Sequence, residues 1–474
     1  MRTGPAVTAA LLLAMVLTAC GDSGTGRPGP APQARPSASA SRANCPDRYA
    51  EPDPNRPRIT LAFDVTDDLT TVTGTERVSF RPDLPVHEVV FRLTGNDPSS
   101  YPSGTAVTVQ RASASVGAAA TTTMRFERAG AAAGSQGGLL VLPLDREVPA
   151  GQEVTATVGF TLTLGGTGFD RFGRIDRFAW FGSAQPLLAW QREVGWHRED
   201  LARYIGESAT SEAANVDLTV TAPGWATVMT SGRQDPPTPA DRGRRRWHAS
   251  APTARDVSVA LGRFALTRET VAGTELTVGA ADASTARQAL AELARAVREL
   301  SARFGPFPFP ALNVSVLPSG GGGIEYPGSI LLFGSSRVVD VHETAHQWFY
   351  GLVGDNQARD PWLDEAFATY AEGLANGDAG GTDQPDPGGP GSGRVGAGIN
   401  DFPTSEAYFG TVYGKGAAAL RRARAQAGAA AFDAAIRCYT NANAWRIARP
   451  ADLASALGDL PSALAALRRA GALS

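Results

Sequence analysis

Residues 342–346 read His-Glu-Thr-Ala-His, and eighteen residues separate the second histidine from Glu365. Residues four apart lie on one face of a helix, so His342 and His346 can bind the same metal ion. Glu343 lies between them and can face a metal-bound water. Two histidines and one carboxylate with an open fourth position are typical of a catalytic zinc site. The sequence therefore predicts one zinc ion per chain, bound by His342, His346 and Glu365, with Glu343 as the general base.

The alternative interpretation of this stretch is a solvated helix with incidental histidines. The chain has 5 His in 474 residues, so a chance His-Glu-x-x-His pattern is rare. Residues 338–341 and 348–353 are mostly apolar, which predicts a largely buried helix. Buried imidazole and carboxylate groups need partners, and a metal ion supplies them. The metal site is therefore the favoured interpretation.

The N-terminus predicts where the protein works. Arg2 precedes a short apolar run at 6–18, which is too short for an ordinary membrane span and is typical of a signal peptide over 1–19. The ending Leu-Thr-Ala-Cys at 17–20 resembles the bacterial lipobox, which implies cleavage before Cys20 and a lipid on its thiol; a plain secretory signal is the alternative. Residues 20–45 are rich in Gly, Pro and Ser and predict a flexible tether. We expect an extracytoplasmic protein, anchored by lipid to the outer face of a bacterial cell membrane or partly secreted.

Composition excludes little but is consistent with a globular enzyme. The net charge of −3 gives no reason to expect a nucleic-acid partner. Cys45 and Cys438 would be exposed to an oxidising compartment, where they either pair or remain two buried thiols. The sequence leaves both alternatives open.

The pattern of apolar residues changes near residue 280 from strand-like alternation to helical periodicity. Segments with alternating apolar and polar residues recur over 46–280, separated by Gly, Pro, Asp or Asn, and predict an antiparallel β-sandwich-like domain. Residues 281–474 carry helical periodicity and contain the metal motif, so they are the predicted catalytic domain. Residues 377–400 are mainly Gly, Asp and Pro and predict a mobile surface loop. The expected fold class is α+β.

Three motifs together resemble the aminopeptidase N family of zinc metallopeptidases, within the gluzincins. The first is the metal motif with its Trp-Leu-x-Glu context at 362–365. The second, Gly-Gly-Ile-Glu-Tyr at 322–326, is similar to the family's Gly-x-Met-Glu-Asn exopeptidase motif. The third is Tyr-Gly-Lys-Gly at 413–416, which contains the chain's single lysine. The likeness covers residues 46–474 and points to the short bacterial lipoprotein branch of the family.

The resemblance implies a thermolysin-like, mainly α catalytic domain after the β domain, without the large C-terminal helical domain of longer members. It implies that Tyr413 donates a hydrogen bond to the oxyanion and that Glu325 pairs with a free α-ammonium group. Gly322, Gly323 and Tyr408 are the other expected substrate-binding residues. The chain departs from the family where Ile324 replaces Met and Tyr326 replaces Asn.

The predicted activity is a zinc aminopeptidase that hydrolyses N-terminal peptide bonds by attack of a metal-bound water on the carbonyl. One alternative is a zinc oligopeptidase that does not need a free N-terminus. Another is a non-catalytic peptide-binding lipoprotein, against which the intact Glu343 argues, because a binding module needs no general base. Peptides and the membrane are the expected partners, and a monomer is the expected state.

Overall fold

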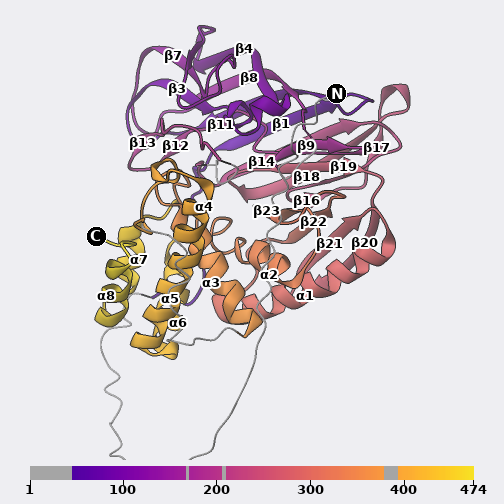
Figure 1. The fold of residues 1–474 in the computed structure, drawn as a ribbon. Coiled ribbons are helices and arrows are strands. Elements are labelled where there is room, and N and C mark those ends of the chain that lie inside the picture. The colour runs from indigo at the N-terminus through magenta and orange to yellow at the C-terminus, as the bar shows by residue number, and fades with distance from the viewer. Residues whose placement is uncertain (1–44, 167–169, 205–209, 378–392) are drawn as a thin grey trace, which may run out of the picture. The chain divides into compact units, whose positions relative to one another are not determined.

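The structure is a computed structural model that describes residues 45–166, 170–204, 210–377 and 393–474 (Figure 1). The predicted signal peptide, Cys20 and nearly all of the tether lie outside these described residues, as does 378–392 of the predicted mobile loop. The described end of that loop is packed, since Val395 and Ile399 are buried. Among the described helices, none has the length and apolar character needed to cross a bilayer.

The N-terminal part is built from antiparallel sheets, as the alternating segments predict. In β1, Ile59, Leu61 and Phe63 are buried while the residues between them are exposed, because successive side chains of a strand point to opposite faces. The largest sheet runs, in spatial order, β16 (Arg233–Gln234), β18 (Arg245–Ala254), β14 (Ala214–Ala222), β1 (Arg58–Val65), β2 (Thr71–Phe80), β8 (Val154–Thr163), β4 (Ala106–Val116) and β5 (Ala119–Thr121), with β17 (Thr238–Pro239) on β18. All pairs of adjacent strands in this sheet are antiparallel except the pair of β1 and β14, which is parallel.

Smaller sheets cover the buried face of this large sheet. One runs β15 (Thr227–Thr230), β19 (Ser258–Gly262), β10 (Phe178–Gly182) and β9 (Phe172–Ile175); another runs β11 (Leu187–Leu188), β3 (Val86–Arg92), β7 (Leu139–Val148) and β6 (Arg125–Glu127); β12 (Trp190–Gln191) pairs with β13 (Gly195–Trp196). Phe63 of β1 contacts Phe160 of β8 and Phe181 of β10, with ring centroids 6.1 and 5.2 Å apart. Side chains of separate sheets thus share one core, the arrangement of a sandwich.

A mixed five-stranded sheet begins the catalytic part. Its order is β20 (Ala265–Val271), β21 (Thr274–Ala280), β22 (Ala311–Val316), β24 (Ser329–Leu332) and β23 (Gly323–Tyr326). The predicted boundary at 280 falls inside this sheet, because β21 pairs with β22 in parallel. Alternation marks a strand but does not tell which sheet it joins. Helix α1 (Ala283–Phe304) begins at Asp282, whose carboxylate accepts hydrogen bonds from the backbone of Ser284 and Thr285, and packs on β20 and β21.

Helices follow this sheet to the end of the chain, so the predicted α+β class is confirmed (Figure 1). They are α2 (Arg337–Ala345), α3 (Glu365–Asn376), α4 (Ser405–Tyr408), α5 (Gly416–Ala427), α6 (Ala429–Ala442), α7 (Pro450–Ala456) and α8 (Pro461–Arg469), with a π-helix, η6 (Phe409–Lys415), between α4 and α5. Short 3₁₀ turns are η1 (Thr94–Asn96), η2 (Tyr101–Ser103), η3 (Asp241–Gly243), η4 (Pro361–Leu363) and η5 (Ile399–Asp401).

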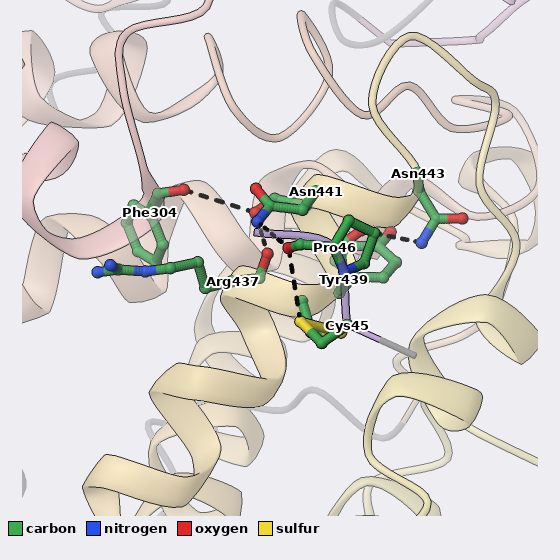
Figure 2. The surroundings of a disulfide bond; sticks show 9 residues. Cys45, Pro46, Phe304, Arg437, Tyr439, Asn441 and Asn443 are labelled. Carbon is green, nitrogen blue, oxygen red and sulfur yellow. Dashed lines mark hydrogen bonds between the residues drawn. A yellow bond between two sulfur atoms is a disulfide. The ribbon is translucent and has the colours of Figure 1, made fainter. Parts of the chain in front are cut away.

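The start of the described chain is fastened to the helical part. Cys45 and Cys438 of α6 form a disulfide, with their Cα atoms 5.2 Å apart, so the alternative of two free thiols does not hold here (Figure 2). The Asn441 side chain donates to the Pro46 carbonyl at 2.7 Å. The Tyr49 hydroxyl accepts from Trp348 Nε1 at 3.1 Å. This segment therefore contacts the catalytic part before the chain enters β1.

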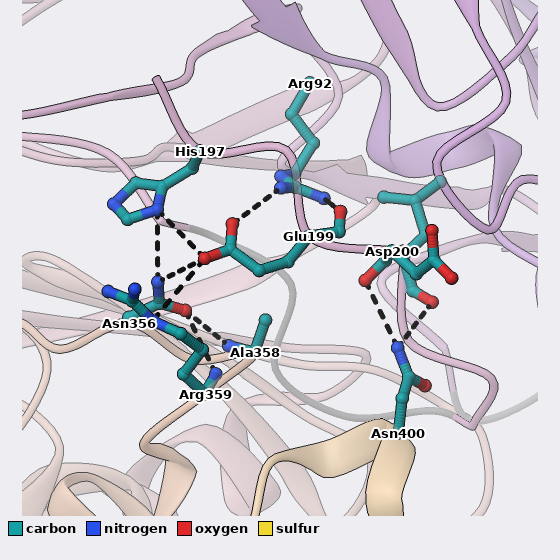
Figure 3. A network of polar contacts seen from close by, with 9 residues as sticks. Arg92, His197, Glu199, Asp200, Asn356, Ala358, Arg359 and Asn400 are labelled. Atoms are coloured by element: carbon teal, nitrogen blue, oxygen red, sulfur yellow. Dashed lines mark hydrogen bonds and ion pairs between the residues drawn. The ribbon is translucent and has the colours of Figure 1, made fainter. Parts of the chain in front are cut away.

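Polar contacts join the two parts next to the active site (Figure 3). The Asn356 amide, from the loop before α3, lies 3.0 Å from Glu199 Oε1 and 3.1 Å from His197 Nδ1. Arg92 of β3 donates to the Glu199 carbonyl at 2.9 Å. Although burial raises it, the hydrogen bond and charge of His197 and the Asn356 amide bring the pKa of Glu199 to about 2. Glu199 therefore remains an anion that holds the Asn356 loop to the β domain.

Candidate active site

Three side chains that the sequence predicts as zinc ligands meet where α2 ends and α3 begins. The Ser336 hydroxyl caps α2, accepting from Val339 N at 3.4 Å. Nε2 of His342 lies 3.2 Å from Glu365 Oε2, and Nε2 of His346 lies 3.5 Å from the same oxygen. The three ligand atoms all lie within 4.8 Å of one another. The three residues that the sequence spacing singles out thus place their ligand atoms at one position.

The helix that carries the histidines is shorter than its apolar flank predicts. It ends at Ala345, and His346 is the C-cap residue, still in helical conformation. The chain turns soon afterwards, because Tyr350 has φ of 107°, which no helix tolerates, and its N–H donates to Val353 O at 2.8 Å. The apolar residues at 348–353 therefore belong to a buried turn and not to a continuing helix, which corrects the sequence interpretation.

A further carboxylate contacts the Nδ1 atom of each histidine. Nδ1 of His342 lies 3.3 Å from Glu372 of α3, and Nδ1 of His346 contacts Asp364. Gln357 donates to Asp364 at 2.9 Å. Sequence reasoning missed these residues, although Asp364 lies inside the quoted Trp-Leu-x-Glu context. Glu372, seven residues after Glu365, is two helical turns along the same face and could have been found by that spacing.

This donor set fits a zinc ion. Each imidazole is bound through Nδ1 to a carboxylate, which fixes the tautomer whose Nε2 lone pair points to the shared position. Burial lowers the pKa of His342, which favours the neutral form that binds metal. Nitrogen and carboxylate donors in this number are what zinc prefers at a catalytic site. A second cluster, made of Glu325, Glu343 and His346, shares His346 and so belongs to the same site.

Glu343 lies beside the ligand set and is 5% exposed. Its Oε2 accepts no hydrogen bond from any group within the described part of the chain. Burial raises the pKa of Glu343 well above its usual value; His346 opposes the rise and Glu325 adds to it. Any side chain at Gly323 would collide with the Glu343 carboxylate, so a glycine is required where β23 passes the helix. This geometry suits a general base, because one carboxylate oxygen is left to accept a proton.

Glu325 lies on β23, which is the last strand of its sheet and pairs only with β24 among the described strands. Gln347, directly after His346, fixes this strand: its amide donates to Tyr326 O at 3.1 Å and its Oε1 accepts from Gly328 N at 2.9 Å. Glu325 is 4% exposed and shares the metal cleft with Glu343. Gln347 is a site residue that sequence reasoning missed, since a glutamine in an apolar run gives no signal of its own.

Tyr413 lies over the first metal ligand. Its ring is parallel to that of His342, with centroids 5.9 Å apart. It belongs to the π-helix η6, a form that inserts an extra residue per turn and often occurs at functional sites. The single lysine, Lys415, donates from the same segment to Gly393 O at 2.8 Å. The structure therefore brings the Tyr-Gly-Lys-Gly motif to the predicted zinc site.

The remaining predicted substrate-binding residues differ in their exposure. Gly322 and Gly323 lie at the open end of β23, where Gly322 has φ of 103°. Tyr408 is fully buried and meets Tyr413 edge-on, with centroids 5.7 Å apart. Its direct contact with substrate stays a prediction, whereas the packing shows it supporting Tyr413.

No known family model matches the chain. An aminopeptidase N from Streptomyces lividans is 32% identical over 134 residues, covering 25% of this chain and 16% of that relative. The match thus spans a small part of the relative's length.

Solved structures match over far more of the chain. The M1 zinc metallopeptidase from Deinococcus radiodurans has a TM-score of 0.63 at 20% identity, covering 88% of this chain and 92% of that one. A mutant of that enzyme bound to a Tyr-Ser-Ala substrate gives 0.64 at 19% identity, covering 88% and 95%. A two-domain M1 zinc metallopeptidase mutant bound to L-tryptophan gives 0.64 at 20% identity, covering 88% and 94%. The predicted resemblance to the aminopeptidase N family of zinc metallopeptidases is therefore confirmed, by the shared fold and by a partial sequence match.

Proposed function

We propose that the protein is a zinc-dependent aminopeptidase that removes residues from the N-termini of peptides. The observation that carries this proposal is the convergence of His342, His346 and Glu365 beside two further buried carboxylates, Glu343 and Glu325. The first three form a metal site, and the other two provide a base and a partner for a cationic chain end. The likeness to an aminopeptidase N and to M1 zinc metallopeptidases supports the same activity.

A zinc ion bound here supplies a Lewis acid that polarises the scissile carbonyl and lowers the pKa of a coordinated water. Glu343 accepts the proton of the attacking water and delivers it to the departing amine. Its buried, unpaired Oε2 is available for that proton. Asp364 and Glu372 keep the two imidazoles oriented with Nε2 toward the ligand position.

Tyr413 is proposed to donate its phenolic hydrogen to the oxyanion that forms during attack. Its ring is parallel to that of His342, one of the predicted metal ligands, which supports this role. A fixed donor at the site of developing charge is effective because it needs no reorganisation during the reaction.

Glu325 is proposed to pair with the free α-ammonium group of the substrate. A charge-assisted hydrogen bond of this kind fixes the end of the chain one residue from the metal. Among the described strands β23 pairs only with β24, so its other edge can receive an extended peptide by backbone hydrogen bonds, which would align the bond to be cut.

The test compares turnover of leucine aminomethylcoumarin with that of its N-acetylated form, using protein whose zinc content has been measured. We expect hydrolysis of the free amine only, loss of activity with a chelator and recovery with zinc. Equal turnover of both substrates would favour the oligopeptidase alternative and exclude the role of Glu325. A zinc-loaded protein that cleaves neither substrate would favour the peptide-binding lipoprotein.

Attachment to the membrane through Cys20 is a separate proposal, and it rests on the sequence pattern at 17–20. The intact protein produced in a bacterial host that processes lipoproteins should partition into the detergent phase of a phase-separation assay. Cys20→Ala should move it to the aqueous phase without changing peptidase activity. Equal partitioning of the two forms would contradict lipidation.

A further inference from the structure

Arg171 of the β domain reaches the active-site glutamate of the catalytic domain. It lies directly before β9, and only 6% of it is exposed. Its Nη2 is 3.9 Å from Glu325 Oε1, and its Nη1 donates to the Tyr326 hydroxyl at 3.3 Å. A buried guanidinium thus contacts both the residue predicted to bind the substrate amine and its neighbour in the strand.

The backbone around Arg171 is held by the sheet of the β domain. Gly182 at the end of β10 donates to Arg171 O at 2.9 Å, and Arg171 N donates to Asp170 Oδ1 at 2.6 Å. The Tyr326 hydroxyl lies so close to Gly182 that any side chain at 182 would collide with it. Tyr326, which stands where the family motif has Asn, therefore fits against the β domain and offers its hydroxyl to Arg171.

Glu325 needs such a partner. Its Oε1 is buried and accepts no hydrogen bond from the groups that the structure describes. A second carboxylate, Glu343, lies in the same cluster, with ligand atoms within 4.8 Å of each other. A buried anion next to another is unfavourable unless a cation compensates it, and the lone carboxylate would otherwise turn away. In the described part of the chain, Arg171 is the residue whose ion pair with Glu325 provides that compensation.

We propose that Arg171 is a positioning residue for the α-amine site: with Tyr326, it holds the Glu325 carboxylate fixed toward the N-terminus of the substrate. This inference rests on the proposed aminopeptidase function and extends it. The β domain then takes part in selecting substrates with a free amine, because the cation that supports Glu325 comes from the residue before β9 and not from the catalytic domain. It also explains why the change from Asn to Tyr at 326 is compatible with amine recognition.

The experiment measures amine recognition without depending on turnover. Leucine hydroxamate and isocaproyl hydroxamate differ only in the α-amine, so the ratio of their dissociation constants, obtained by calorimetry on zinc-loaded protein, reports the amine site. Wild-type protein should bind the amine-bearing compound more tightly, and Glu325→Gln should remove the preference. We expect Arg171→Met to lower the preference about tenfold, because a less firmly positioned Glu325 would weaken its charge-assisted hydrogen bond to the amine. Binding of the isocaproyl compound should stay unchanged.

Three further variants separate positioning from general damage. Arg92→Met removes an equally buried arginine of the β domain that pairs with Glu199, and it should leave the preference intact. Arg171→Lys should restore part of it, and Tyr326→Phe should reduce it by a smaller factor than Arg171→Met. If Arg171→Met does not fold, the result for Tyr326→Phe together with Arg171→Lys decides the question.

The outcomes distinguish this inference from the proposed function. A wild-type protein without preference for the amine would overturn both. A preference that depends on Glu325 but is unchanged or strengthened in Arg171→Met and Tyr326→Phe would overturn the positioning role alone. An equal loss of preference in Arg92→Met would show a general effect of disturbing the β domain and would also overturn it.

Discussion

The core of the β domain and the active-site cleft each bury a glutamate whose carboxylate is not satisfied by hydrogen bonds. Glu76 on β2 is fully buried, and neither of its carboxylate oxygens accepts a hydrogen bond from the described residues. Glu343 on α2 is 5% exposed and has one such oxygen. In both cases burial raises the pKa of the carboxyl group above its ordinary value. A raised pKa by itself therefore does not identify a functional carboxylate in this protein.

The neighbours of the two glutamates differ. Glu76 pairs across the sheet with Leu61 and Val158, and burial is the only cause of its raised pKa. Around Glu343, His346 lowers the pKa of the carboxyl group and Glu325 raises it. The active site thus holds several titratable groups next to a ligand set, whereas the core of the β domain holds one isolated acid. We expect mutations of Glu343 to change the catalytic activity and mutations of Glu76 to change stability only.

Glu343→Gln should give the largest effect. The amide keeps the shape of the side chain but cannot accept a proton, so turnover should fall about a thousandfold. Zinc content, measured by metal analysis after dialysis, should remain that of the wild type because Glu343 is not one of the three predicted ligands. Retained activity would rule out Glu343 as the base.

Asp364→Asn tests whether the carboxylates behind the histidines matter. Losing the acceptor charge at His346 Nδ1 should weaken zinc binding by roughly 10- to 100-fold. Competition with a chromogenic chelator gives the affinity, and Asp360→Asn, a nearby acid in the same loop, provides the matched control. A zinc affinity equal to that of the wild type would mean that the His346–Asp364 contact does not orient the ligand.

Glu76→Leu should stabilise the protein without changing turnover. Replacing an unpaired buried acid by an apolar side chain of similar size should raise the free energy of unfolding by about 2 kcal/mol at neutral pH. The folded-state pKa of Glu76 lies above the unfolded value, so the wild type loses stability as pH rises above the unfolded pKa. The gain from Glu76→Leu should therefore shrink as pH falls toward 4.5, the ordinary value.

Denaturant unfolding of wild type, Glu76→Leu and Glu76→Gln across pH measures this effect. Glu76→Gln keeps the shape and removes the ionisation, so its stability should not depend on pH through this position. A less stable Glu76→Leu would show that the carboxyl group has a partner that stabilises the core.

His248 represents the opposite case, an exposed titratable group with two partners, and should give the smallest effect. Hydrogen bonds to Asp217 and Asp235, at 2.9 and 2.7 Å, raise the pKa of His248. A raised folded pKa means that the stabilisation is complete below the ordinary value of 6.5 and is lost as pH rises through the folded pKa. His248→Asn should flatten this part of the stability profile slightly in thermal unfolding scans. An identical profile for both proteins would show that the network contributes nothing measurable.

Much of the secondary structure could be predicted, because local patterns carry it. Alternation over 58–63 and 154–160 marks real strands, and the periodicity of 286–304 marks α1. The end of α2 could not be predicted, since it depends on the positive φ of Tyr350 within a buried apolar turn. The sheet that β20 and β21 join could not be predicted either, because the alternation of a strand is the same whichever strand it pairs with.

The metal ligands could be recognised in the amino-acid sequence as a pattern, since residues four apart share a helix face and Glu365 follows in a recognisable context. The sequence also predicted the candidate base, and it indicated Tyr413 and Glu325 through the resemblance. The residues that support them could be found only in the folded chain: Glu372 and Asp364 at the histidines, Gln347 at β23, and Arg171 at Glu325. The Arg171–Glu325 pair joins residues of different domains, and no local pattern encodes which charges meet when two domains pack together.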